Sequence, residues 1–364
     1  MIIKINRQEF IDKLTFGSRF TSTKLSSLQI LQGVQIKKRG NGLHFFSSNL
    51  SAYYHSSLPV EGEKEGDFVV EPKKIIEFLS FLPDGKIDLE VDPKQLLIKA
   101  KKTVGRFPLI IEKEFPQPPK IEEKEQKINT GFLLKFLPLV LFAASPDETR
   151  PALSGVNFVT NDELIMVATD GFRLSLIKAK KETRFPPVII PADFLKELIH
   201  FLKEDKETRF SYSNKEKTVV FRAGETELYS RLIEGDFPPY EKVIPQEKRT
   251  TVKLEKEEFL RNIKLISVFA RDLSYIITLD IKKNGVKFMP KTTEGEENTS
   301  FQEAEVEGEG QKVAFNYKFI LEFLNSVNSK NIIVDILRPD APVAFRLENN
   351  KDFLHIIMPV RIQE

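Results

Sequence analysis

The sequence repeats one pattern three times, and each copy begins roughly a third of the chain after the last. Two helix-like stretches recur in every copy. The first contains a phenylalanine followed by isoleucine or leucine, at Phe10-Ile11, Phe132-Leu133 and Phe259-Leu260. The second surrounds one apolar residue, at Ile75, Phe194 and Phe319. Such a repeat constrains the fold more than any single motif does, because each copy must form the same structure.

The strand-like segments between the helices repeat in the same order. Residues 31–34 (LQGV) match residues 153–156 (LSGV), and residues 43–49 (LHFFSSN) match residues 164–170 (LIMVATD). The first and second copies also close alike, with IIEKEFP and LIEGDFP. Features that keep one order at a constant offset indicate three copies of one α+β unit.

Each copy is long enough to be a domain, because a unit of about 120 residues can bury a core of its own. Proline and charged residues cluster at 115–127 (FPQPPKIEEKEQK) and at 237–250 (FPPYEKVIPQEKRT), which is typical of linkers. We therefore predict domains at residues 1–120, 121–245 and 246–364.

The composition restricts the class of protein. Hydrophobic residues make up 41% of the chain, yet no stretch approaches the ~18 apolar residues of a membrane span. The N-terminus lacks the apolar stretch and cleavage site of a signal peptide, so we expect a cytoplasmic protein without a membrane partner. The absence of cysteine excludes disulfides, thiol nucleophiles and thiolate metal sites. A charged fraction of 30% with 30 phenylalanines also suggests a thermophilic source.

Positive charge gathers on the predicted helices, although the net charge is only +2. In the helix around Phe259, one face collects Lys253, Lys256, Lys264 and Arg271. The second helices of the copies add Lys73, Lys74, Lys196, Lys203 and Lys318. A solvated surface explains such charges on a single helix, but helices that line one common surface would make that surface basic.

Residues with catalytic chemistry do not converge. The four histidines show neither the close spacing of a metal pair nor a nucleophile motif. Asp147, Glu148 and Asp170 lack a second convergent pair, so turn roles fit them better than acid-base or metal chemistry. The glycine-rich segments lack the context of a phosphate loop. The sequence therefore predicts no catalytic residues, no metal and no cofactor.

Two segments are more specific. Residues 167–176 (VATDGFRLSL) place Asp170-Gly171 between apolar runs, which predicts a tight hairpin turn because glycine accepts positive φ. Residues 355–364 (HIIMPVRIQE) read as an apolar strand in which Pro359 marks a sheet edge. Apolar residues this close to a terminus must pack inward or line a groove.

At these residues the sequence resembles the bacterial DNA polymerase III β subunits, the sliding clamps. The shared motifs follow the family order: RPALSGV (150–156), VATDGFRL (167–174), SRLIEGDFPPY (230–240), AFNYKFIL (314–321) and MPVR (358–361). The resemblance implies an α+β fold of three DNA-clamp domains, each with two helices and a pair of antiparallel sheets. It further implies a head-to-tail homodimer that forms a six-domain ring.

The resemblance implies a non-catalytic processivity factor. Such a ring encircles double-stranded DNA without sequence specificity and needs only enough positive charge on its inner helices to avoid repulsion. The implied partners are DNA, the DNA polymerase III α subunit, the clamp loader δ subunit and other proteins with short clamp-binding motifs.

The family binds those motifs in a groove between its second and third domains. Matched residue by residue, the groove would consist of Leu153, Gly155, Thr169, Gly171, Phe172, Arg173, Leu174, Pro238, Lys242, Val243, Phe319, Met358, Pro359, Val360, Arg361 and Ile362. Apolar walls would bury the hydrophobic end of the motif. Phe172 stands where the family commonly has histidine, and Glu241-Lys242 replaces two arginines, which affects partner preference.

The resemblance also places the ring contacts. One side would comprise Lys74, Phe78, Leu82, Phe107 and Leu109, and the other side Ile266, Glu294, Glu296 and Glu297. Phe78 and Leu82 lie four residues apart, so both can face a partner, and the alternative is that both belong to the core. DNA contacts from loops are expected at Lys24 and Arg150.

Two other classes of function remain open. A monomeric three-domain adaptor would use the groove without closing a ring, and its oligomeric state would separate it from a clamp. A hydrolase with Asp170 and His200 as acid-base groups lacks an accompanying nucleophile or metal motif.

Overall fold

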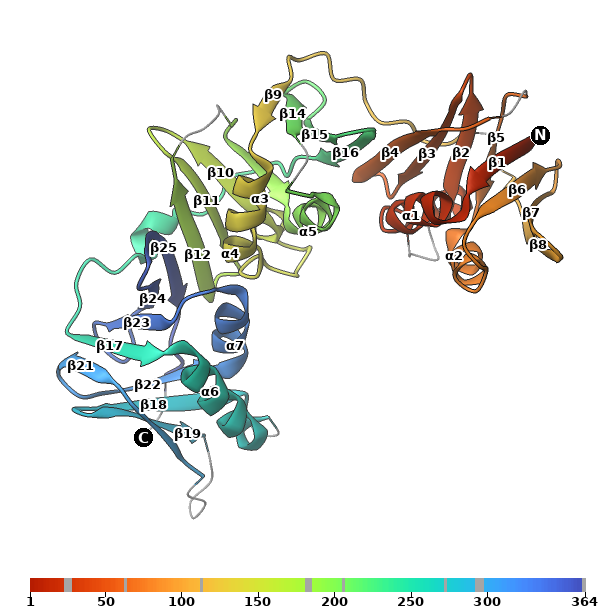
Figure 1. Ribbon diagram of the computed structural model, residues 1–364. Helices are drawn as coiled ribbons and strands as arrows, with labels where there is room; N and C mark the ends of the chain where they lie inside the picture. Colours follow the sequence, from red (N-terminus) through yellow and green to blue (C-terminus); the bar gives the residue numbers. More distant parts are fainter. Residues whose placement is uncertain are drawn as a thin grey trace. The chain divides into compact units, whose positions relative to one another are not determined.

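Antiparallel strands dominate the computed structural model (Figure 1). The structure describes residues 1–22, 28–61, 64–111, 114–180, 185–204, 207–271, 274–291 and 298–361. The chain divides into two units. We call Met1–Gly131 with Lys196–Leu232 the first unit, and Phe132–Leu195 with Ile233–Glu364 the second unit.

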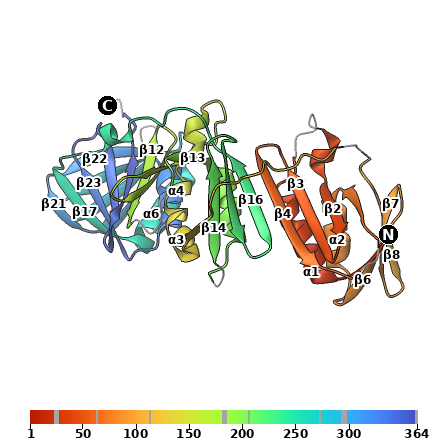
Figure 2. The same ribbon diagram turned by 90° about the horizontal axis from the view of Figure 1, so that it is seen from above.

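The first unit contains two antiparallel sheets. The wider sheet has the order β5 (Gly66–Val70), β2 (Val34–Arg39), β3 (Gly42–Ser48), β4 (Ala52–Pro59), β16 (Thr226–Arg231), β15 (Thr218–Ala223), β14 (Thr208–Ser213), β9 (Gln126–Ile128). The other has the order β1 (Ile2–Asn6), β6 (Lys86–Val91), β7 (Gln95–Ala100), β8 (Thr103–Pro108). Helices α1 (Arg7–Ser18) and α2 (Pro72–Ser80) contact each other, and α1 packs on β3 (Figures 1 and 2). A short 3-10 helix, η1 (Gln29–Gln32), precedes β2.

Local sequence explains where these helices begin and which side they bury. Asn6 caps α1, because its side-chain oxygen accepts hydrogen bonds from two backbone N–H groups at 2.8 and 3.3 Å. Pro72 opens α2, where its missing N–H removes no helical hydrogen bond. Phe10 and Leu14, four residues apart on α1, are buried, and Phe10 packs against Phe45 of β3 with ring centroids 5.9 Å apart.

The second unit also contains two antiparallel sheets. The wider sheet has the order β13 (Val188–Pro191), β10 (Gly155–Thr160), β11 (Leu164–Thr169), β12 (Arg173–Ala179), β25 (Asn350–Ile357), β24 (Val343–Leu347), β23 (Asn331–Ile336), β17 (Thr250–Glu255), β21 (Glu305–Gly308). The other has the order β20 (Ser300–Glu303), β19 (Gly285–Pro290), β18 (Ile276–Lys282), β22 (Gln311–Asn316). Its helical segments are η2 (Pro151–Ser154), η3 (Tyr240–Val243), α4 (Pro138–Leu141), α6 (Lys256–Ala270) and α7 (Tyr317–Ser326). The division between the units falls within α3 (Thr130–Phe136) and α5 (Ala192–Phe201).

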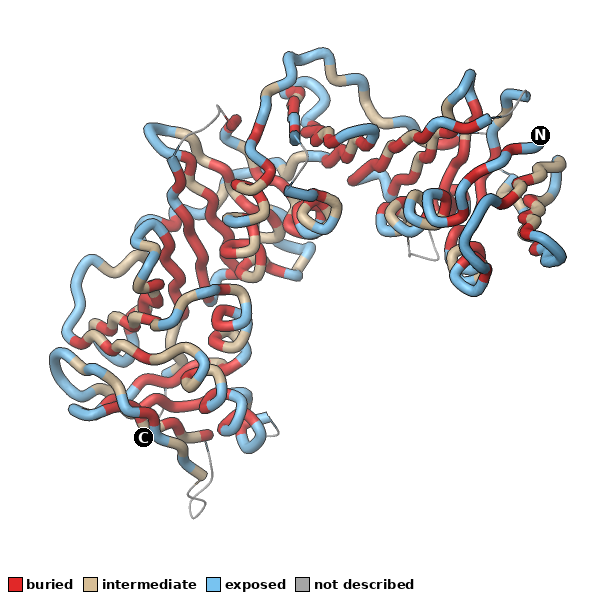
Figure 3. The backbone as a smooth tube through the Cα atoms, in the orientation of Figure 1, coloured by how far each residue is buried: buried red, intermediate tan, exposed pale blue. Residues whose placement is uncertain are grey.

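Buried residues follow the strands and parts of the helices in both units (Figure 3). In β1 the alternate residues Ile3 and Ile5 are buried, and in the neighbouring β6 the alternate residues Ile87 and Leu89 are buried. This period of two places one side of each strand in the core.

The element order confirms the repeated α+β unit that the sequence predicts. Each copy runs through a strand, a helical stretch, four strands, a helix and three strands: β1 to β8, β9 to β16, and β17 to β25, where β21 is an additional strand. In the second copy the first helical stretch is split into α3 and α4 at Pro138. A proline lacks the N–H that would continue the helical hydrogen bonds, which explains the break.

Strands pair between copies as well as within them. In the first unit, β4 of the first copy pairs with β16 of the second copy, with Tyr53 opposite Tyr229. In the second unit, β12 of the second copy pairs with β25 of the third copy, with Leu174 opposite Ile356. We call these the first seam and the second seam. Each wide sheet contains strands from two copies, so the boundaries of the two units differ from the boundaries of the three copies. The predicted domain boundaries therefore stay predictions.

The segment 115–127, which reads as a linker in the sequence, lies on the wide sheet of the first unit. Phe115 is buried beside Val69 of β5, and Ile121 packs against Tyr229 of β16. The apolar side chains in this proline-rich segment therefore attach it to the sheet.

Hydrogen-bonded polar side chains cross the first seam. His55 Nδ1 lies 2.9 Å from Glu227 Oε2, and His55 Nε2 lies 3.2 Å from His44 Nδ1. Arg222 Nε donates to Glu227 Oε1 at 2.8 Å, and the Tyr229 hydroxyl donates to Glu227 Oε2 at 2.9 Å. Hydrogen bonding by His55, followed by that of Arg222 and Tyr229, lowers the pKa of Glu227 to about 2.

Glu227→Gln should destabilise the chain in a pH-dependent way. The pKa of Glu227 is about 2 when folded and 4.5 in the reference state, so the carboxylate stabilises the fold above pH 4.5 and loses that effect as the pH falls toward 2. We expect the variant to be less stable by ~1–2 kcal/mol at pH 7, allowing for solvent screening, and the difference to narrow on acidification. Urea unfolding of both proteins across this range measures it, and a difference independent of pH would contradict the assignment.

Candidate functional site

The turn between β11 and β12 is the best-defined part of the candidate site. Asp170 Oδ1 accepts hydrogen bonds from the backbone N–H groups of Phe172 (2.9 Å) and Arg173 (3.0 Å). Thr169 Oγ1 donates to the carbonyl of Arg173 at 2.6 Å and accepts from the N–H of Gly171 at 3.1 Å. Gly171 has φ +93°, which favours glycine. The predicted Asp-Gly hairpin is confirmed, and it leaves the Phe172 side chain exposed.

Arg173 links this turn to helix α7. Its Nε lies 2.9 Å from Asp170 Oδ2, and its Nη1 lies 2.7 Å from Glu322 Oε2 on α7. The guanidinium lies over the ring of Phe319, 4.7 Å from the centroid, and 5.8 Å from that of Phe142. A buried cation held by two carboxylates and two rings is a fixed structural element rather than a free charge.

The C-terminal segment joins the same turn. The N–H of Met358 donates to the carbonyl of Phe172 at 2.8 Å, directly after β25 pairs with β12. The N–H of Val360 donates to the carbonyl of Ala314 at 2.8 Å, and Pro359 between them has no N–H to donate. These two bonds hold Met358, Pro359 and Val360 half-buried beside the turn.

An apolar cluster lies on one face of the sheet at the second seam. Its buried members come from four strands and η3: Val167, Leu174, Leu176, Tyr240, Ala344, Leu354 and Ile356. Phe237 and Ile244 pack against it from either side of η3. Pro238, Lys242 and Val243 lie on this anchored segment and are exposed. The structure thus brings Leu174 of the hairpin and the 237–244 segment to one surface.

Leu153 and Gly155 lie where η2 leads into β10. The Leu153 carbonyl accepts a hydrogen bond from the Ser145 N–H at 2.8 Å, which holds the half-buried residue in place. A Cβ on Gly155 would lie 2.6 Å from Ile189 Cγ2 and 2.8 Å from the carbonyl oxygen of Ile190. Only glycine permits this approach between β10 and β13.

Arg150, predicted as a DNA contact, lies beside the hairpin turn. Its Nη1 is 3.5 Å from the position of a Cβ on Gly171, and its Nε is 3.3 Å from Asp147 Oδ2. About half of its side chain is exposed. The structure therefore places this cation at the rim of the candidate groove, and its contact with DNA stays a prediction.

Five of the predicted site residues lie outside the described residues, namely Lys24, Glu294, Glu296, Glu297 and Ile362. Arg361, the last described residue, is exposed.

The residues predicted for one side of a ring contact lie together on α2 and β8 in the first unit. Phe78 packs edge-on against Phe107, with ring centroids 5.4 Å apart, and Lys74 is exposed. Leu109, just after β8, is half-buried. Leu82 is buried in the core, as the alternative interpretation of this residue expects.

Ile266, predicted for the other side, faces the core of the second unit. It is 2% exposed and shares the buried face of α6 with Phe259 and Ile263. Its neighbours Leu265 and Val268 project to the surface instead, and Val268 is 58% exposed. The helical period of 3.6 residues accounts for the difference, because a residue one position away lies on another face.

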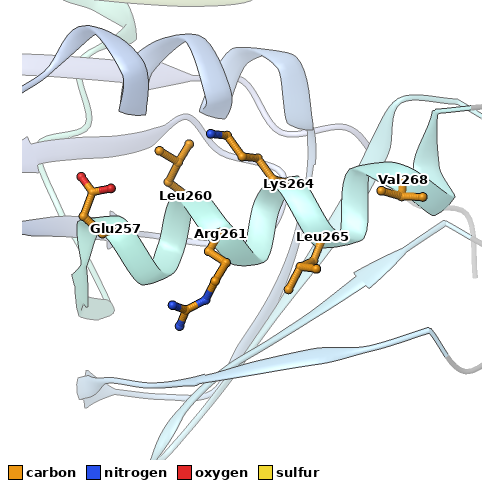
Figure 4. A pocket seen from close by; sticks show the side chains of 6 residues that line it. All are labelled: Glu257, Leu260, Arg261, Lys264, Leu265 and Val268. Atoms are coloured by element: carbon orange, nitrogen blue, oxygen red, sulfur yellow. The ribbon is translucent and has the colours of Figure 1, made fainter.

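The exposed face of α6 contains a shallow hollow of about 400 Å³. Its lining combines three apolar and three charged side chains of the helix (Figure 4): Glu257, Leu260, Arg261, Lys264, Leu265 and Val268. An apolar strip flanked by cations is suited to contact with a macromolecule.

Several residues that build the groove are absent from the sequence prediction. Phe142 and Glu322 hold Arg173 from helices far away in the sequence. His355 is buried beneath it, with Nδ1 2.7 Å from Ser175 Oγ and its ring stacked 4.8 Å from that of Phe323. Burial, and then the charge of Arg173, lowers the pKa of His355 well below its usual value, so the ring stays neutral. No local motif marks these residues, although the apolar run on both sides of His355, from Phe353 to Ile357, is typical of a buried strand.

Among the described residues, no group of His, Asp and Glu side chains is arranged to hold a metal ion. In the same part of the chain, no helix is long and apolar enough to cross a membrane.

Three family models match successive parts of the chain. They describe the N-terminal domain of the DNA polymerase III beta subunit at residues 1–117, its central domain at 127–239 and its C-terminal domain at 241–361.

Curated relatives agree with these matches over nearly the whole length. The beta sliding clamp of Bacillus subtilis is 30% identical over 353 residues, covering 92% of this chain and 93% of that protein. That of Synechocystis is 28% identical over 351 residues, covering 88% and 89%.

Solved structures show the same fold. The DNA polymerase III beta subunit of Thermotoga maritima has a TM-score of 0.92 at 25% identity, covering 100% of both chains. The DnaN sliding clamp of Bartonella birtlesii, solved bound to griselimycin, has a TM-score of 0.92 at 25% identity with the same coverage.

Gly155→Ala should destabilise the second unit, because the added methyl group must displace the backbone of Ile190 or the side chain of Ile189. We expect a loss of ~1–3 kcal/mol in the free energy of unfolding, measured by urea denaturation. Gly66→Ala is the matched control, since its Cβ would meet only the flexible side chain of Met1, and its cost should stay within about 0.5 kcal/mol. Equal costs for both variants would contradict the tight approach at Gly155.

Proposed function

This chain belongs to the family of DNA polymerase III β subunits, the β sliding clamps, and on that premise we propose that it works as a closed ring around DNA. Its relatives are non-catalytic processivity factors, so the chain is not an enzyme. Two protein chains join head to tail into a six-domain ring that encircles double-stranded DNA and slides without sequence specificity. The ring tethers the replicative polymerase in the cytoplasm, and its three domains per chain follow the boundaries 1–120, 121–245 and 246–364.

The pairing of strands between copies is the observation that supports closure. β4, β12 and β20 hold the same place in the three copies, and so do β8, β16 and β25. Within the chain, β4 pairs with β16 and β12 pairs with β25, so each copy joins the next by the same two kinds of strand. Applied once more, this rule pairs β20 of the third copy with β8 of the first copy in a second chain.

β8 and β20 have the properties that such a joint requires. Each is the last strand of its four-stranded sheet, so its outer backbone groups face no strand among the described residues. Val104 on β8 is 44% exposed and Phe301 on β20 is 45% exposed. Arg106 and Glu303, also exposed, provide opposite charges on the two strands. Antiparallel pairing would bury the apolar side chains and satisfy the free backbone groups.

The helices beside these strands extend the proposed joint. On one side, Lys74, Phe78, Phe107 and Leu109 remain the proposed contacts, and the exposed Phe81 adjoins them at the end of α2. On the other side, Leu265 and Val268 on the exposed face of α6 replace the buried Ile266. Apolar faces on both sides favour a stable joint rather than a transient one.

Encirclement accounts for the modest charge of the chain. A ring retains DNA by its closed topology, so its helices need only limit repulsion from the phosphates. Exposed Lys73 and Lys318 on the second helices of two copies, and Arg261 and Lys264 on α6, would supply that charge. Lys24 and Arg150 remain proposed loop contacts to the duplex.

The groove at the second seam is the proposed binding site for partner proteins. The apolar cluster around Leu174 would take the hydrophobic end of a short linear motif from the polymerase α subunit, the clamp loader δ subunit or another clamp-binding protein. Exposed Phe172 and Lys242 border the cluster and give this groove its own partner preference. Arg173 contributes a fixed surface, because its charge is already paired with Asp170 and Glu322.

Retention on circular DNA tests encirclement directly. After loading onto a nicked plasmid, the protein should remain bound in about 0.5–1 M NaCl, where binding by phosphate contacts alone is lost. Cutting the plasmid once should release it, because the ring slides off the ends. Gel filtration of the two samples measures retention. Equal retention on linear and circular DNA would refute encirclement, and a protein that stays monomeric would support the adaptor.

Met358→Ala combined with Pro359→Ala should abolish binding of a polymerase-tail peptide, since both residues lie half-buried beside the hairpin turn. Fluorescence anisotropy of the labelled peptide measures the affinity, and we expect it to fall by about a hundredfold or more. Met289→Ala with Pro290→Ala removes the same residue types from β19 and should bind the peptide as the wild type does. Unchanged affinity in the first variant would refute the groove.

A further inference from the structure

The edge strand β20 is attached to helix α6 in an unusual way. It has only four residues, and Gln302 is the one whose side chain is fully buried. The neighbouring strand β19 meets α6 through apolar side chains, such as Phe288, whose ring lies 5.8 Å from that of Phe259. The inner side of β20 therefore contacts the helix through polar groups, whereas the inner side of β19 contacts it through apolar ones.

Amide and hydroxyl groups make the contacts between β20 and α6. Gln302 Nε2 donates to the carbonyl of Glu255, the residue that caps α6, at 2.9 Å. Asn262 Nδ2 on α6 donates to Gln302 Oε1 at 3.5 Å, and the Ser300 hydroxyl donates to Asn262 Oδ1. Asn262 is buried as well. The two amides and the hydroxyl form a connected chain from the start of α6 to the edge strand.

Such a chain specifies position more sharply than an apolar contact does. An apolar strand can slip by two residues and still bury a similar area, whereas a buried amide must meet its own partner. A slip of β20 by two residues would bring Ser300 or Ala304 to the place of Gln302. Neither side chain can donate to the Glu255 carbonyl across the same distance, so the slipped register would leave buried polar groups unpaired.

We propose that Gln302, supported by Asn262, is a positioning residue that fixes the register of β20 for pairing with β8 of a second protein chain. This inference rests on the proposed head-to-tail closure. Each backbone group of β20 must meet a particular group of β8, and an edge strand free to slip would offer its outer hydrogen bonds in several registers. The hydrogen bonds of these amide groups select one register of β20 before the two protein chains meet.

Gln302→Met tests this role, because methionine keeps the length and bulk of the side chain and removes its hydrogen bonds. We expect the dissociation constant of the dimer, measured by analytical ultracentrifugation, to rise at least about tenfold, since a correctly registered edge is present only part of the time. The melting temperature should stay within about 3 °C of the wild type, because methionine fills the same buried space and the loss is confined to one short edge strand.

Gln311→Met is the matched control. Gln311 is a partly buried amide on β22, the opposite edge of the same sheet, and its Nε2 donates to Thr250 Oγ1 at 2.9 Å. This variant should dimerise as the wild type does. Hydrogen exchange provides a second readout, and residues 300–303 should exchange faster in monomeric Gln302→Met than in monomeric wild type.

The outcomes distinguish a failure of the positioning role of Gln302 from a failure of the proposed head-to-tail closure. A wild-type dimer with an unweakened Gln302→Met dimer would overturn the positioning role and leave the ring intact. Equal weakening by Gln302→Met and Gln311→Met would also overturn it, because both losses would then reflect general stability. A wild type that is monomeric at every concentration would overturn closure itself, and the positioning role with it.

Discussion

Backbone pairing at strand edges is the interaction on which this architecture depends. The first and second copies of the α+β unit each have a strand, β4 and β12, that pairs with a strand of the next copy. The two seams inside the chain are therefore ordinary antiparallel ladders rather than loose contacts between finished domains. Side chains on the faces of these ladders can therefore differ between the first and the second seam, because main-chain hydrogen bonds already hold the copies together.

The candidate groove is a product of the second seam. The Phe172 carbonyl accepts a hydrogen bond from the Met358 N–H because β12 and β25 lie side by side. Arg173 of the second copy likewise contacts Glu322 on α7 of the third copy across the same seam. No single copy contains the whole groove. Pairs such as Leu174 with Ile356 show that the register of the ladder also decides which apolar side chains meet on its face.

The sequence predicts what recurs or what has a local signature. The threefold repeat identifies the copies and their element order, and Asp170-Gly171 identifies the hairpin, because both depend on residues near one another in the chain. Phe142 and Glu322, the partners of Arg173 outside the hairpin, have no local signature, because Phe142 follows α4 of the same copy and Glu322 lies on α7 of the third copy. Ile266 illustrates a finer limit: motif matching places it at a surface contact, whereas the structure buries its side chain. The apolar spacing of Phe259, Ile263 and Ile266 shows this face of the helix to be buried.

The two seams differ in polarity at one place in the ladder. Where the second seam has Leu176 opposite Leu354, the first seam has His55 opposite Glu227, and the segment around Ile121 packs nearby. A hydrophobic motif on the first seam would have to displace water from an ionised carboxylate, so under the proposed function that surface is unsuited to the motif that the second seam would bind. Under the proposed function, the described part of each chain therefore has one motif-binding groove at its two seams, and partner proteins that use it would compete for it.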